Sequence, residues 1–83
     1  MELLARTVEL AIPQVNWFAL GDAKRIAQNM RIAVRDYNKN PTDATQHARL
    51  RAVAEQAQAF LFQRATEEAK DTAYKLGRVL KAH

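Results

Sequence analysis

The 83-residue chain contains no cysteine and no serine, and it has only two glycines and two prolines. Without cysteine it can form no disulfide and no thiolate metal site. Without serine or cysteine, the usual nucleophilic triads are excluded. The two glycines, Gly21 and Gly77, lie far apart, so there is no glycine-rich phosphate loop. The composition therefore predicts a protein that is not an enzyme.

Residues that ligate metal ions are also scarce. His47 and His83 are the only imidazoles. Asp43 and His47 lie one helical turn apart and supply two ligands, but a stable site needs three or four. The sequence therefore predicts no metal ion and no cofactor.

Long apolar runs are missing as well, and none approaches the length of a membrane span. The start of the sequence, Met1 to Leu4, lacks the basic residues of a signal peptide. These absences favour a cytoplasmic protein with no membrane partner. Residues 1–83 form one predicted domain. A chain of this size buries only roughly 60% of its unfolded surface, which favours a homo-oligomer, most simply a dimer.

The longest segment with a clear secondary-structure pattern runs from Asn40 to His83. Its apolar residues recur every three or four positions and indicate a helix. They are Leu50, Val53, Ala54, Ala57, Leu61, Ala65, Ala69, Ala73, Leu76, Val79 and Leu80. Asn40 is the predicted N-cap, with Pro41 at the first helical position. Unbroken, this helix would be roughly 60 Å long, more than the preceding helices can cover. Either it breaks and folds back, at Ala65–Thr66 or at Gly77, or a second molecule covers it.

Two shorter helices are predicted before it. The first covers residues 1–12, and Pro13 should end or kink it. The second begins near Gly21–Asp22, or already at Asn16, and stops by residues 38–40. Its inner seam is Ala23, Ile26, Met30, Ala33 and Tyr37. The predicted fold is all-α: a short N-terminal helix, a helical hairpin, and a long C-terminal helix, completed as a small bundle by oligomerisation.

Several large apolar residues do not fit one buried stripe and are candidates for a protein interface. Phe60, Leu61 and Phe62 cover more than half of the helix circumference, because successive residues point about 100° apart. Either one phenylalanine is exposed, or the segment is covered on two sides. The full set of interface candidates is Trp17, Phe18, Ile32, Phe60, Phe62, Leu76 and Leu80. Trp17 is either a plug between helices or an anchor for a partner.

Basic residues cluster most clearly on the second predicted helix. The net charge is +4 and the isoelectric point is about 9.9. Basic and amide side chains fall on one helical face, namely Lys24, Gln28, Arg31, Arg35 and Asn38, with Lys39 beside them. This face is either an ordinary solvated surface or a contact for phosphates or an acidic partner.

The sequence leads to two hypotheses about function. The first is a small helical interaction protein that binds a protein partner, as an adaptor, an inhibitor of a larger machine or an assembly subunit. The alternative is a nucleic-acid-binding regulator that uses the basic stripe. Salt dependence separates the two, because binding driven by phosphates weakens steeply with salt and apolar binding barely changes.

Overall fold

All regular structure in the described part of the chain, residues 1–18 and 21–82, is α-helical in the computed structural model. The four helices are α1 (Glu2–Trp17), α2 (Gly21–Lys39), α3 (Ala44–Phe62) and α4 (Glu67–Ala82). The predicted all-α class is confirmed. The second helix begins and ends where its sequence pattern indicated.

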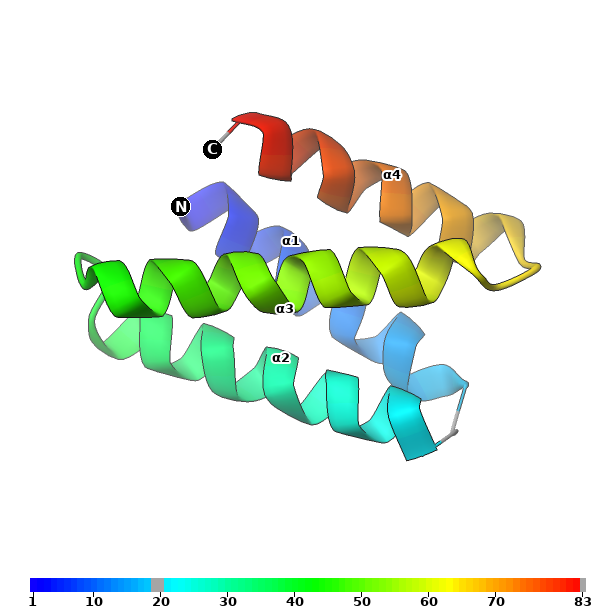
Figure 1. Ribbon diagram of the computed structural model, residues 1–83, viewed down its shortest axis with the longest axis horizontal. Helices are drawn as coiled ribbons and strands as arrows, with labels where there is room; N and C mark the ends of the chain where they lie inside the picture. Colours follow the sequence, from blue (N-terminus) through cyan, green and yellow to red (C-terminus); the bar gives the residue numbers. More distant parts are fainter. Residues whose placement is uncertain (19–20, 83) are drawn as a thin grey trace.

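The α1 and α3 helices form the centre of the molecule. Each of them packs against the other three helices, whereas α2 and α4 do not contact each other. In Figure 1, α3 crosses in front of α1, with α2 below the pair and α4 above it. Consecutive helices run in opposite directions. The resulting bundle is flat, with extents of 36 × 25 × 15 Å.

The core is built from one apolar side of each helix. All five predicted seam residues of α2 are buried, which confirms that seam. Many core positions are alanine, which allows close helix packing but buries little area per side chain. The larger fully buried residues, Leu4, Met30, Leu50, Leu61 and Leu76 among them, therefore supply most of the hydrophobic stabilisation. Each such leucine contributes roughly 1.5–3 kcal/mol by leaving water.

The first helix does not end at Pro13, so of the two predicted outcomes, an end or a kink, the first is wrong. It continues for another turn to Trp17, with Pro13 inside it. Pro13 itself is exposed, whereas Ala11, Ile12 and Val15 around it are buried. The lost backbone hydrogen bond therefore falls on the side facing water, and burial beyond the proline holds the helix together.

The start of α3 also differs from the prediction. Residues 41–42 form a turn, in which the Asp43 N–H donates to the Asn40 carbonyl at 3.1 Å. Asp43 is the N-cap, and its carboxylate accepts a hydrogen bond from the Thr45 N–H at 2.8 Å. Pro41 is thus a turn residue, not the first residue of the helix, and Asn40 is not the cap.

The predicted long helix is broken between α3 and α4, at residues 63–66. Thr66, one of the proposed break points, accepts a hydrogen bond from the Ala69 N–H at 3.2 Å and so helps to start α4. Gly77, the other candidate, lies inside α4, where a Cβ would collide with the Gln58 side chain of α3. The chain therefore folds back on itself. This removes the reason for placing a second molecule at the C-terminal end, and the dimer stays a prediction.

The cap of α3 can be tested by paired alanine substitutions. Asp43→Ala should lower the free energy of unfolding by about 1 kcal/mol, because the Thr45 N–H loses its acceptor. Asn40→Ala should change it by less than about 0.5 kcal/mol, as for surface residues outside a cap. Urea unfolding followed by circular dichroism measures both. A larger loss for Asn40→Ala than for Asp43→Ala would contradict the observed cap.

Candidate protein-binding surface

A row of large apolar side chains lies exposed on α1. Leu3, Leu10 and Trp17 are 57%, 74% and 74% exposed. Their seven-residue spacing keeps them on one side of the helix, with a drift of only about 20° per step. The other two exposed large apolar residues of the described chain, Phe62 and Tyr74, pack edge to face on each other at 5.1 Å. The Leu3–Leu10–Trp17 ridge therefore holds three of the five exposed large apolar residues of the described chain, and Phe62 with Tyr74 forms a smaller exposed pair.

Beside the ridge, a groove of about 560 Å³ runs between α1 and α4. Its α1 wall contains Leu3, Thr7, Leu10, Ala11 and Gln14, and its α4 wall contains Thr72, Lys75, Arg78, Val79 and Ala82. The charged residues of this lining are both basic. The Lys75 ammonium forms an ion pair with the Asp71 carboxylate, one turn earlier in α4, at 3.1 Å. Arg78 forms no ion pair with any described residue.

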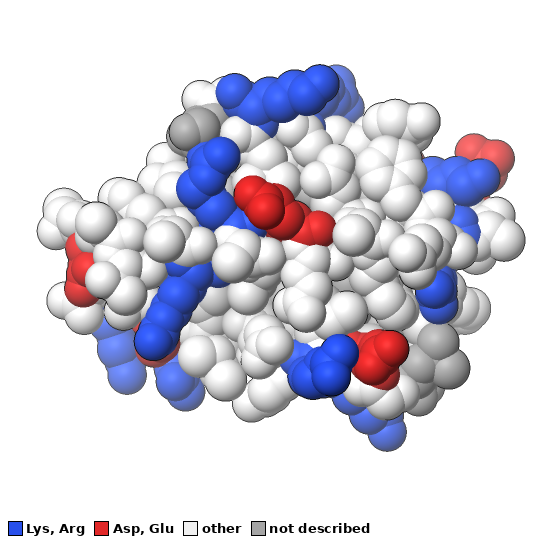
Figure 2. All heavy atoms as spheres, viewed as in Figure 1, with Lys and Arg blue, Asp and Glu red and all other residues white. Residues whose placement is uncertain are grey.

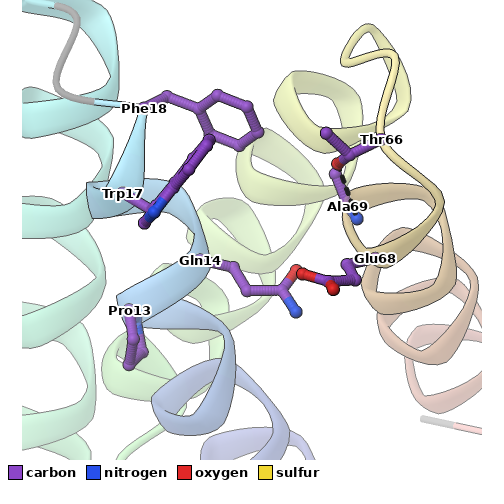
Figure 3. Close-up of a pocket in the computed structure, with 7 residues that line it drawn as sticks. All are labelled: Pro13, Gln14, Trp17, Phe18, Thr66, Glu68 and Ala69. Atoms are coloured by element: carbon purple, nitrogen blue, oxygen red, sulfur yellow. Dashed lines mark hydrogen bonds between the residues drawn. The ribbon is translucent and has the colours of Figure 1, made fainter.

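A second hollow of about 270 Å³ adjoins the groove near the C-terminal end of α1. Its lining is Pro13, Gln14, Trp17 and Phe18 from α1, with Thr66, Glu68 and Ala69 from the start of α4. Figure 3 shows the Gln14 side chain reaching from α1 towards Glu68. Gln14 lines both hollows, and its side-chain oxygen accepts a hydrogen bond from the Thr72 hydroxyl at 2.7 Å. The two hollows thus form one continuous apolar face with an acidic end and a basic end.

An aromatic cluster fixes the Trp17 end of this face. The ring of Phe18 meets Trp17 edge to face at 5.3 Å and Phe60 at 5.7 Å. The Arg64 guanidinium lies 4.5 Å from the centre of the Phe60 ring, within the range of a cation–π contact. Because Phe60 is buried in α3, the cluster ties the exposed Trp17 to the core. Trp17 is therefore a supported surface residue and not a plug between helices.

The predicted interface residues do not all lie on one surface. Phe60, Leu76 and Leu80 are buried in the core of the chain, so their proposed role as surface contacts is wrong in this fold. Phe62 is exposed but lies at the α3–α4 turn against Tyr74. Ile32 is half-buried in a separate groove between α2 and α3.

Sequence reasoning found Trp17 but missed the two leucines of the ridge. Leu3 and Leu10 were not among the interface candidates, although both precede Trp17 at multiples of seven residues. That spacing was the available signal. Phe18, the remaining candidate, caps the end of α1, is half-buried, packs edge to face on Trp17 and lines the same hollow as Glu68. It supports the surface and contributes only part of its ring to it.

The predicted basic stripe lies together on the outer side of α2 and is called the basic face below. All six of its residues, Lys24, Gln28, Arg31, Arg35, Asn38 and Lys39, are exposed. Figure 2 shows lysine and arginine side chains projecting along the lower edge of the molecule, where α2 lies. Arg35 approaches Asp36 at 3.4 Å, whereas Lys24, Arg31 and Lys39 form no ion pair with another described residue. The α2 helix carries five basic and two acidic residues, so most of the net charge lies on this side.

Among residues 1–18 and 21–82, no group of three His, Asp or Glu side chains is placed to hold an ion. His47 instead contacts the Pro41 carbonyl and lies 5.8 Å from the Tyr37 ring, centre to centre. His83 lies outside the described residues. No described helix combines the length and apolar character needed to span a bilayer.

Comparisons with protein-family models, with curated proteins and with solved structures find no match to this chain. Two surfaces of the described chain are candidates for binding. They are the α1–α4 face, made of the Leu3–Leu10–Trp17 ridge and the two hollows beside it, and the basic face of α2.

Proposed function

We propose that the chain is a small non-enzymatic interaction protein that acts by binding another protein through the α1–α4 face. The observation that carries this proposal is the Leu3–Leu10–Trp17 ridge. Large contiguous apolar patches on small proteins mark interaction sites, because leaving them in water is unfavourable. An adaptor, an inhibitor or an assembly subunit all act by such binding.

The composition of the ridge suits an interface. Tryptophan is enriched among the residues that dominate binding energy, particularly where a rigid surface supports them. Trp17 is supported by Phe18 and through it by Phe60. Covering the ridge would remove apolar area from water at roughly 25 cal/mol per Å². The groove beside the ridge provides a concave surface into which a partner's apolar side chains can pack.

A capture experiment with matched variants tests this proposal. The immobilised wild-type chain should retain protein from an extract of its source cell, treated with nuclease, and Leu10→Glu should retain at least about tenfold less. Leu10 is largely exposed, so this change should leave the fold intact. Ala59→Glu, at an exposed position of α3, is the control and should retain as much as wild type. Equal retention by both variants would contradict the proposal.

A nucleic-acid-binding regulator is the second candidate, and the basic face of α2 favours it. No described helix covers this face, and Lys24, Arg31 and Lys39 are exposed without acidic partners among the described residues. Basic side chains in a row can contact successive phosphates, with Gln28 and Asn38 adding hydrogen bonds. Binding of this kind depends on charge and not on the α1–α4 face.

Salt titration of the basic face tests this second function. Binding to labelled DNA or RNA should weaken with salt, and changing Lys24, Arg31 and Arg35 together to glutamine should abolish it. Each lost phosphate contact lowers the salt slope by about one unit on duplex DNA. The control changes Arg6, Lys70 and Lys81 to glutamine, which removes the same charge from other exposed positions. Wild-type protein that binds no nucleic acid at low salt would exclude this function.

A further inference from the structure

We propose that the partner on the α1–α4 face is a second copy of this chain, packed in the opposite direction about a two-fold axis near Leu10. The inference rests on the proposed function, in that it takes this face to be a protein-binding surface. It adds the identity of the occupant and its orientation. The spacing of the ridge and the distribution of charge on α4 both lead to it.

The ridge is symmetric about its middle residue. Leu3 and Trp17 lie seven residues before and after Leu10, roughly 10 Å to either side along the helix. When two copies of α1 pack in opposite directions with Leu10 on the axis, Leu10 meets its counterpart and each Trp17 meets Leu3 of the other copy. A two-fold interface requires this kind of self-complementary patch. Trp17 of one copy would then lie over the groove that Leu3 and Val79 line in the other.

The orientation follows from the position of α4 beside α1. Glu68 shares one end of the face with Trp17, and Arg78 shares the other end with Leu3. A two-fold axis that reverses α1 also reverses α4 and keeps both copies of α4 on the same side of the paired α1 helices. In a parallel pair they would lie on opposite sides and could not meet.

Charge on α4 is divided between its two ends. The first half holds three acidic residues, Glu67, Glu68 and Asp71, and one lysine, Lys70, whereas the second half holds three basic residues, Lys75, Arg78 and Lys81, and no acidic one. The reversed pairing therefore brings the acidic start of one α4 alongside the basic end of the other, at both ends of the interface. Lys75 already binds Asp71 within its own chain, and Lys81 lines a separate hollow with residues of α3. Glu68 and Arg78 line opposite ends of the α1–α4 face, so they are the pair that meets across the interface. A face with one acidic and one basic end suits its own reversed copy better than a surface of uniform charge, such as anionic lipid.

Sedimentation of the purified 83-residue chain tests whether a second copy binds at all. From low micromolar to millimolar concentration, the mass should rise from 9.4 kDa towards twice that value. Leu10→Glu places two carboxylates at the axis and should keep the protein monomeric throughout. The Ala59→Glu control should associate like wild type. A wild-type chain that stays monomeric at every concentration would overturn the second-copy proposal and leave the capture experiment to decide whether another protein binds.

Mixing two charge-reversed variants tests the orientation. Glu68→Lys alone sets lysine against Arg78 of the other copy, and Arg78→Glu alone sets glutamate against Glu68. Each variant should therefore dimerise about tenfold more weakly than wild type, from two altered ion pairs per dimer. In an equimolar mixture both contacts again join opposite charges, so association should return close to the wild-type level.

Restoration by mixing requires that the two positions face each other in different copies, so a change in monomer stability alone cannot produce it. Circular dichroism melting of each variant confirms that both monomers are folded. If the wild type dimerises but the mixture associates no better than either variant alone, the reversed arrangement is wrong.

Discussion

The packing of α1 directly against α3 is the constraint on which the rest of the molecule depends. Because these two helices meet at the centre, α2 and α4 lie on opposite sides of them and cannot contact each other. Each central helix is then covered on one side only and keeps an outward face. On α3 that face carries small residues such as Ala48, Ala52 and Ala59, whereas on α1 it carries the Leu3–Leu10–Trp17 ridge. The outward face of α1 is therefore more apolar than that of α3, which is why the proposed binding surface is placed on α1.

The sequence was informative wherever a segment has a strong helical period and a clear end. The seam and both ends of α2 were predicted, because its apolar and charged residues separate cleanly around the helix. Local rules failed where packing opposed them. Pro13 disfavours helix, yet burial of Val15 beyond it continues α1 to Trp17. Asn40 and Pro41 form a good local start, but the turn they make places Asp43 at the cap instead. Boundaries set by tertiary contacts cannot be read from neighbouring residues alone.

One candidate surface could be predicted from the sequence and the other could not. The basic face of α2 was predictable, since it depends on spacing within one helix. The error for Phe60, Leu76 and Leu80 came from the position of the break, because folding α4 back on α3 buries these residues inside the chain. With α4 folded back, the exposed row of large apolar side chains lies on α1 and not at the C-terminal end. Leu3 and Leu10 looked like ordinary residues of a short amphipathic helix until the neighbours of α1 were known.

Trp17 is the only tryptophan, so its fluorescence reports directly on whether the ridge becomes covered. The emission spectrum and acrylamide quenching of the unmodified chain should be followed as its concentration rises. At low concentration an exposed indole should emit at long wavelength and be quenched efficiently, as its 74% exposure requires. Cover by a second copy should shift the emission to shorter wavelength and reduce quenching in step with association. Emission that stays at the exposed position while the protein associates would contradict the ridge as the interface.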